Sequence, residues 1–156
     1  MLAQAMAPTG ALMAFIALFS GAFWGRPTWG TYWVWDARLT SELILFFLYL
    51  GFIALHSAID DKRRADRAAS VISIVGVINV PIIYFSVQWW NTLHQGASIT
   101  SRGSSIAPIM LYTLLIMVVA GMCYGAGMVL ARTRSIILER ERRENWTKEA
   151  ALEGKL

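Results

Sequence analysis

One histidine stands among aromatic residues in a way that could bind a ligand. His94 closely follows the pair Trp89-Trp90, and the only other histidine in the chain is His56. A lone histidine is usually a satisfied polar residue, but a neutral imidazole nitrogen is also a common ligand of haem iron. Because the ring follows a tryptophan pair, we take His94 as a candidate axial ligand of haem iron.

A second cluster of aromatic residues lies earlier in the chain and ends in an acid. Between positions 24 and 35 there are four tryptophans and one tyrosine, followed by an aspartate: Trp24, Trp29, Tyr32, Trp33, Trp35 and Asp36. If the segment forms a short interfacial helix, Trp29, Tyr32, Trp33 and Asp36 share one face. Such a face would be a flat aromatic platform for an apolar ligand, with Trp35 beside it. The alternative is an aromatic belt at headgroup depth.

Charged residues near this cluster have both structural and ligand-binding interpretations. Asp36 is a typical N-cap for the helix that follows it. Arg38 and Glu42 stand four residues apart and can pair, although an acid near the membrane edge is also a functional candidate. Arginines bind carboxylates well, and three are candidates to contact haem propionates: Arg26, Arg38 and Arg102.

Four apolar blocks must position these residues. The chain has 156 residues, of which 56% are hydrophobic and 15% are charged. The blocks cover about 3–24, 37–57, 70–90 and 106–131, and about 20 apolar residues suffice for a helix to cross a bilayer. Barrel strands would be shorter and would alternate with polar residues. The sequence predicts an all-α membrane protein, residues 1–156 forming a single membrane domain of four transmembrane helices.

Basic residues set the expected orientation of these helices. Four lie in the loop between the second and third blocks and seven in the tail from residue 132, whereas the other two loops together hold three. Because loops rich in Lys and Arg stay in the cytoplasm, we expect both termini and the tail 132–156 there. Loops 25–36 and 91–105 would then lie on the outer face of the membrane, which the resemblance described below implies is the periplasmic face. Topology and contact with the lipid bilayer explain the net charge of +4, so no nucleic acid is expected.

Three motifs resemble a known family. The run from Trp24 to Thr40, WGRPTWGTYWVWDARLT, resembles the tryptophan-rich WWD signature of haem-handling membrane proteins. Together with NVPI at 79–82 and WWNTLHQG at 89–96, it closely resembles the haem exporter protein C family of bacterial cytochrome c maturation. The similarity extends over essentially the whole chain.

The resemblance implies a function as well as a fold. It implies a multi-pass protein of the bacterial inner membrane, not an enzyme, that presents non-covalently bound haem b at the periplasmic face. The implied partners are a periplasmic haem chaperone and other maturation subunits, including an ABC transporter. The loop from Trp29 to Asp36 matches the part that supports the macrocycle, and His94 matches the second of two iron-binding histidines.

The chain also departs from the family pattern. The first iron-binding histidine of the family lies in an earlier periplasmic loop, between two N-terminal helices that have no counterpart in this sequence. The chain therefore resembles the last four helices of a six-helix protein, and it lacks one of the two implied iron ligands.

Two other classes of function compete with haem delivery. The chain could be a membrane anchor subunit of a redox enzyme, with an aromatic pocket for quinone or haem. Such anchors usually place haem histidines inside their helices, and neither histidine lies at mid-membrane here. A small-solute permease has little support, because Glu42 is the only acidic residue within a predicted span and no inverted repeat is evident.

Overall fold

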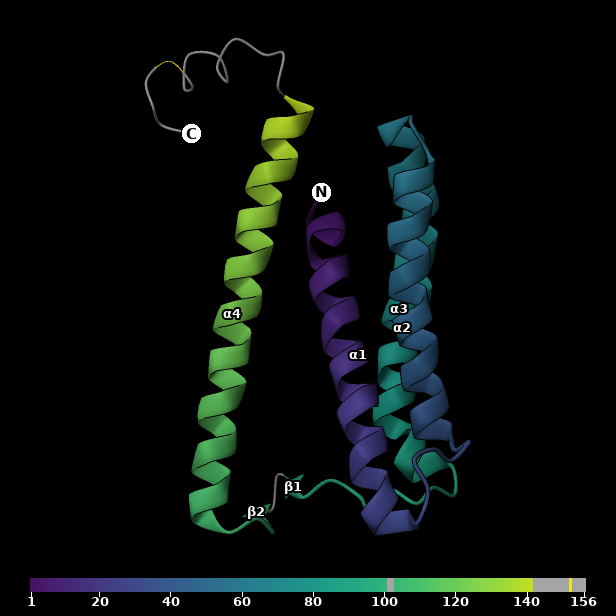
Figure 1. Ribbon diagram of the computed structural model, residues 1–156, viewed down its shortest axis with the longest axis vertical. Coiled ribbons are helices and arrows are strands. Elements are labelled where there is room, and N and C mark those ends of the chain that lie inside the picture. Colours follow the sequence, from purple (N-terminus) through teal and green to yellow (C-terminus); the bar gives the residue numbers. More distant parts are fainter. Residues whose placement is uncertain (101–102, 142–151, 153–156) are drawn as a thin grey trace.

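Long helices dominate the computed structural model, which describes residues 1–100, 103–141 and 152 (Figure 1). The helices are α1 (Leu2–Trp29), α2 (Ala37–Ala58), α3 (Lys62–Trp89) and α4 (Pro108–Arg140). A short antiparallel ribbon of β1 (Ile99–Thr100) and β2 (Gly103–Ser104) lies between α3 and α4. All four helices are long and apolar enough to cross a membrane. The prediction of an all-α membrane protein with four spans is therefore confirmed.

Three helices extend beyond the apolar blocks that predicted them. α1 continues to Trp29 rather than ending near residue 24, α3 begins at Lys62 rather than near 70, and α4 continues to Arg140 rather than ending near 131. Hydropathy marks only the part of a helix suited to hydrocarbon, whereas backbone hydrogen bonding continues into polar sequence. Asp61 fixes the early start of α3, because its carboxylate accepts the backbone N–H groups of Arg63 and Arg64.

Helices α1 and α2 form the middle of the bundle, because α2 packs against α1 and α3, and α1 also contacts α4. Figure 1 shows α4 standing apart from α2 and α3. Small residues allow the close approach of α1 and α2: α1 buries four alanines, and the ring of Tyr49 occupies the space that a Cβ at Gly10 would fill, 2.5 Å from it.

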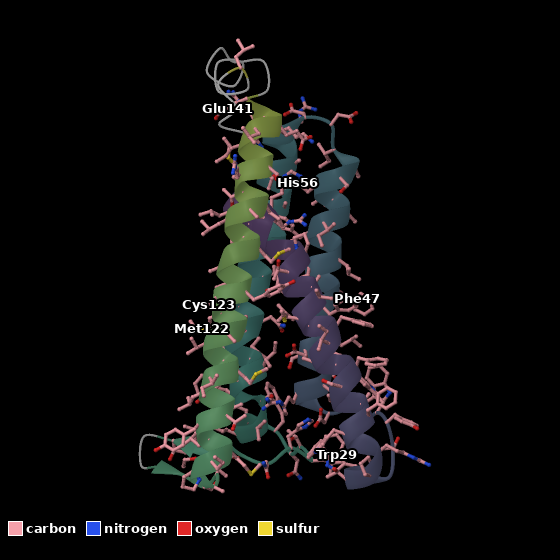
Figure 2. The ribbon with its side chains drawn as sticks, turned by 60° about the vertical axis from the view of Figure 1, so that its left-hand side comes forward. Trp29, Phe47, His56, Met122, Cys123 and Glu141 are labelled. Atoms are coloured by element: carbon pink, nitrogen blue, oxygen red, sulfur yellow. The ribbon has the colours of Figure 1, made fainter. Side chains whose placement is uncertain are left out.

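The bundle has two ends, which we name by their key residues (Figure 1). The His94 end carries segments 30–36, 90–100 and 103–107. The Asp66 end carries the start of α1, the turn between α2 and α3, and the end of α4. Figure 2 shows Trp29 and His56 near these opposite ends.

An ion-pair network joins all four helices at the Asp66 end. Both oxygens of Asp66 accept from the Arg140 guanidinium, at 3.0 and 3.1 Å. Nε2 of His56, a buried residue on α2, donates to Asp66 at 3.0 Å, and Arg140 also donates to Gln4 of α1 at 3.1 Å. His56 is thus engaged in holding the helices together.

A buried hydrogen bond joins α2 to α3 nearer the His94 end. The Asn79 side-chain amide donates to the backbone carbonyl of Ser41 at 2.9 Å, and both residues are buried. Polar groups in lipid are stabilised only when they find a partner within the protein. This bond therefore fixes the start of α2 against α3, and with it the position of the residue that caps α2.

Candidate functional site

Asp36 joins two distant parts of the chain. Its Oδ1 accepts the backbone N–H of Leu39 at 2.8 Å, which caps α2 as the sequence predicted. Its Oδ2 lies 2.8 Å from Nδ1 of His94, a contact the sequence alone did not indicate. The Asp36 side chain is only 4% exposed and that of His94 17%, so the pair is shielded from solvent.

The imidazole of His94 is also fixed by its other neighbours. Its ring meets the indole of Trp29 edge to face, with centroids 4.7 Å apart and planes at 72°. The backbone N–H of His94 donates to the hydroxyl of Thr92 at 2.9 Å, which tightens the turn carrying the histidine. The ring is thus held by an acid, an aromatic face and its own loop.

The contact with Asp36 determines which nitrogen of His94 can bind a metal. A carboxylate only accepts hydrogen bonds, so the neighbouring Nδ1 must carry the proton. In a neutral ring Nε2 then keeps its lone pair. Histidines that ligate metals commonly donate their other N–H to a carboxylate, which orients the ring and raises its basicity. The Asp36–His94 pair has this arrangement.

Two hollows border the His94 ring. The larger, of about 610 Å³, lies between α2, α3 and the backbone of 94–98; the smaller, of about 230 Å³, lies between α1 and α2. Four residues border both hollows: Trp24, Arg38, Glu42 and His94. Small-molecule sites commonly measure about 300–1,000 Å³, and the larger hollow is within that range.

The predicted aromatic platform is not a helix face. Gly30 adopts a left-handed conformation, φ 81°, and ends α1 directly after Trp29. Segment 33–36 then continues without helix, because the chain must bring Asp36 in extended form to the start of α2. The expectation of one flat shelf is therefore wrong.

The platform residues separate into two groups. Trp29 packs against His94, whereas Trp33 and Trp35 meet edge to face at 77° and Trp35 is 75% exposed. Among the described residues, the indole N–H of Trp33 is buried without a hydrogen-bond partner. Tyr32 is exposed and lies under the Arg26 guanidinium.

The three candidate arginines also differ in their placement. Arg38 borders both hollows beside His94. Arg26 instead donates to the carbonyl of Gly30 at 2.8 Å, which ties it to the end of α1. Arg102 lies outside the described residues.

Trp24, which the sequence placed in the aromatic cluster, and Glu42, which it left as a functional candidate, both border this site. Trp24 precedes Trp29 on α1, its ring 5.4 Å from that of Trp29. Glu42 follows Arg38 by one helical turn. Among the described residues no salt bridge within 4.0 Å joins Glu42 to Arg38, the pairing that the sequence allowed, and both side chains border the hollows. For Glu42 the available signal was its spacing of one helical turn from Arg38, whereas Trp24 stands five residues from Trp29, which is not a same-face spacing.

Comparisons with known proteins identify the family of the chain. The sequence profile of the family described as Heme exporter protein C matches residues 1–148. The chain belongs to this family. Its members are transport and delivery components of membranes rather than enzymes, as the sequence predicted, and this chain is a multi-pass membrane protein.

Individual relatives show how far the similarity extends. Heme exporter protein C of Escherichia coli K12 is 52% identical over 148 residues, which cover 95% of this chain and 60% of the relative. That of Bradyrhizobium diazoefficiens is 55% identical over 139 residues, 88% of this chain and 53% of the relative. A putative cytochrome c biosynthesis ccmC-like mitochondrial protein of Marchantia polymorpha is 46% identical over 132 residues, which cover 85% of this chain and 55% of the relative. The chain thus spans at most 60% of these relatives' length.

Proposed function

We propose that this chain carries haem for cytochrome c maturation and presents it from the His94 end. The observation that carries the proposal is the shielded Asp36–His94 pair, whose imidazole borders a hollow of about 610 Å³. Family membership supports haem as the cargo, since the relatives are named for haem export.

The residues at the His94 end suit haem chemically. Nε2 of His94 would ligate the iron, because Asp36 engages the other ring nitrogen. The indoles of Trp24 and Trp29 would contact the macrocycle, and Arg38 would pair with a propionate. The sequence has no Cys-x-x-Cys-His, so the haem b would be held non-covalently.

Basic residues support a location in the bacterial inner membrane with the Asp66 end in the cytoplasm. Lys62, Arg63, Arg64 and Arg67 all lie in the first turns of α3, at that end of the bundle. Positive charge is retained on the cytoplasmic side of bacterial membranes. His94 would then lie at the periplasmic face, where a haem chaperone could collect the cargo. Other maturation subunits, including an ABC transporter, would complete the system.

Haem titration of the purified chain tests the proposal. We expect a Soret band that His94→Ala shifts or removes, because the axial ligand is lost. His56→Gln is the matched control, since this histidine is bonded to Asp66 at the opposite end and its loss should leave the band unchanged. A band insensitive to His94→Ala would refute the proposal. If quinone-dependent electron transfer were also found, the redox-anchor alternative would replace it.

A further inference from the structure

A groove continues from the His94 site along the apolar part of the helices. The larger hollow beside His94 adjoins another of about 250 Å³, and both are bordered by Leu45 and Val80. The second hollow extends toward the Asp66 end as far as Ala3 and Phe52. The two hollows are therefore neighbours, and we use the word groove for the pair, which together extends from the His94 site toward the Asp66 end.

Three helices shape the groove. α2 contributes Leu45, Leu48 and Phe52, α1 forms one wall, and α3 forms the other. Along the α3 wall, Val77, Val80 and Tyr84 are 70%, 52% and 62% exposed. In a membrane such exposed apolar residues contact lipid. The groove therefore opens sideways to the bilayer.

The polarity of the groove changes along its length. Arg38, Glu42 and His94 border only the part at the His94 end, whereas Ser73 and the Tyr49 hydroxyl are the only polar side-chain groups bordering the second hollow. A ligand with a flat apolar body and an anionic edge matches this gradient. Within the groove its body would stay among apolar groups, as in the bilayer, while its carboxylates would reach Arg38.

We propose that haem reaches His94 sideways from the bilayer, along this groove, rather than from the aqueous phase. The inference rests on the proposed function, since it names the route by which the same cargo arrives. It assigns a role to residues that do not touch the iron ligand: Val80, at the junction of the two hollows, and Gly76, deeper in the groove, form the path.

Blocking the groove at its junction tests the route. Val80→Trp would place an indole where the two hollows meet. Ile78→Trp is the matched control, because Ile78 is 57% exposed on the same helix and borders none of the described hollows. Each variant is loaded in two ways. In one it is reconstituted in phosphatidylcholine vesicles that contain haem; in the other haem is added from aqueous stock to the chain in detergent.

We expect Val80→Trp to slow growth of the Soret band from vesicle haem about tenfold, equal to about 1.4 kcal/mol of barrier. Because Val80 also borders the larger hollow, direct addition is compared on Gly76→Phe instead, and Ile78→Trp should match the unmodified chain in both arms. Loading of Val80→Trp from vesicles at the unmodified rate would overturn the route. The absence of a His94-dependent band from the unmodified chain in either arm would instead refute the proposed function.

A second variant separates blocking from misfolding. A Cβ at Gly76 meets nothing within 4 Å, so Gly76→Phe would fill the second hollow without disturbing residues near His94. Because Gly76 borders only the second hollow, we expect Gly76→Phe to load slowly from vesicles and normally by direct addition. Two results with Gly76→Phe would overturn the route. Normal loading from vesicles would show that haem does not pass along the groove. Loss of direct loading would show that the second hollow is not separate from the haem site.

Discussion

The contact between Asp36 and His94 predicts a specific effect of removing one charge. Asp36→Asn keeps the size of the side chain and an oxygen able to cap α2, because Asn and Asp are comparable N-caps. The carboxylate that accepts from His94 at 2.8 Å becomes a neutral amide. Hydrogen bonds to charged groups are about twice as strong as neutral ones, and loss of such a supporting group typically weakens metal binding about 10–100-fold.

We therefore expect Asp36→Asn to raise the haem dissociation constant about 10–100-fold, or about 1.4–2.8 kcal/mol, with little change in unfolding free energy. Spectroscopic haem titration measures the first quantity and thermal unfolding in detergent the second. Asp61→Asn is the matched control, because Asp61 also caps a helix but lies at the opposite end, accepting from Arg63 and Arg64. It should leave haem affinity unchanged.

Two results would refute this reasoning. If Asp36→Asn bound haem as tightly as the unmodified chain, Asp36 would be only a helix cap. If its affinity fell in proportion to a loss of stability, the effect would be structural. Asp36→Ala gives the comparison, since losing the cap as well should cost about 1 kcal/mol of folding free energy in addition to the weaker haem binding.

Two further predictions concern orientation and the opposite end of the bundle. In a Cys123→Ala background, a cysteine at Ala97 should react with a membrane-impermeant maleimide in intact cells, whereas one at Ala58 should react only after lysis; the reverse pattern would invert the proposed topology. Asp66→Ala removes the bonds to Arg140 and His56 and should lower the unfolding free energy by about 2 kcal/mol. The loss is not larger because the Asp66 side chain is 39% exposed and solvent screens its charge. Thermal unfolding measures this loss. The control Glu139→Ala should leave the unfolding free energy almost unchanged, and an equal loss in both variants would contradict the role of the network.

Much of the fold could be predicted because the hydropathy of a segment depends only on the residues within that segment. An apolar block of about 20 residues must be helical in a bilayer, where every backbone polar group needs a partner within its own segment. The cap by Asp36 was predictable for a similar reason, since it depends on residues three apart. Helix ends were less predictable: α1 continues through Trp24 to Trp29 because Gly30, not the edge of the apolar block, ends it.

The sequence by itself determined the four spans, their apolar character and a candidate ligand at His94. Only the tertiary structure decided what surrounds that ligand. Asp36 and His94 are 58 residues apart, and they meet because α2 and α3 run side by side and bring their loops to one end. Helical spacing could not indicate that Trp33 and Trp35 would pack against each other, or that Trp24 would border both hollows. Those positions depend on where α1 ends and how α1, α2 and α3 pack, which are long-range properties that no local pattern encodes.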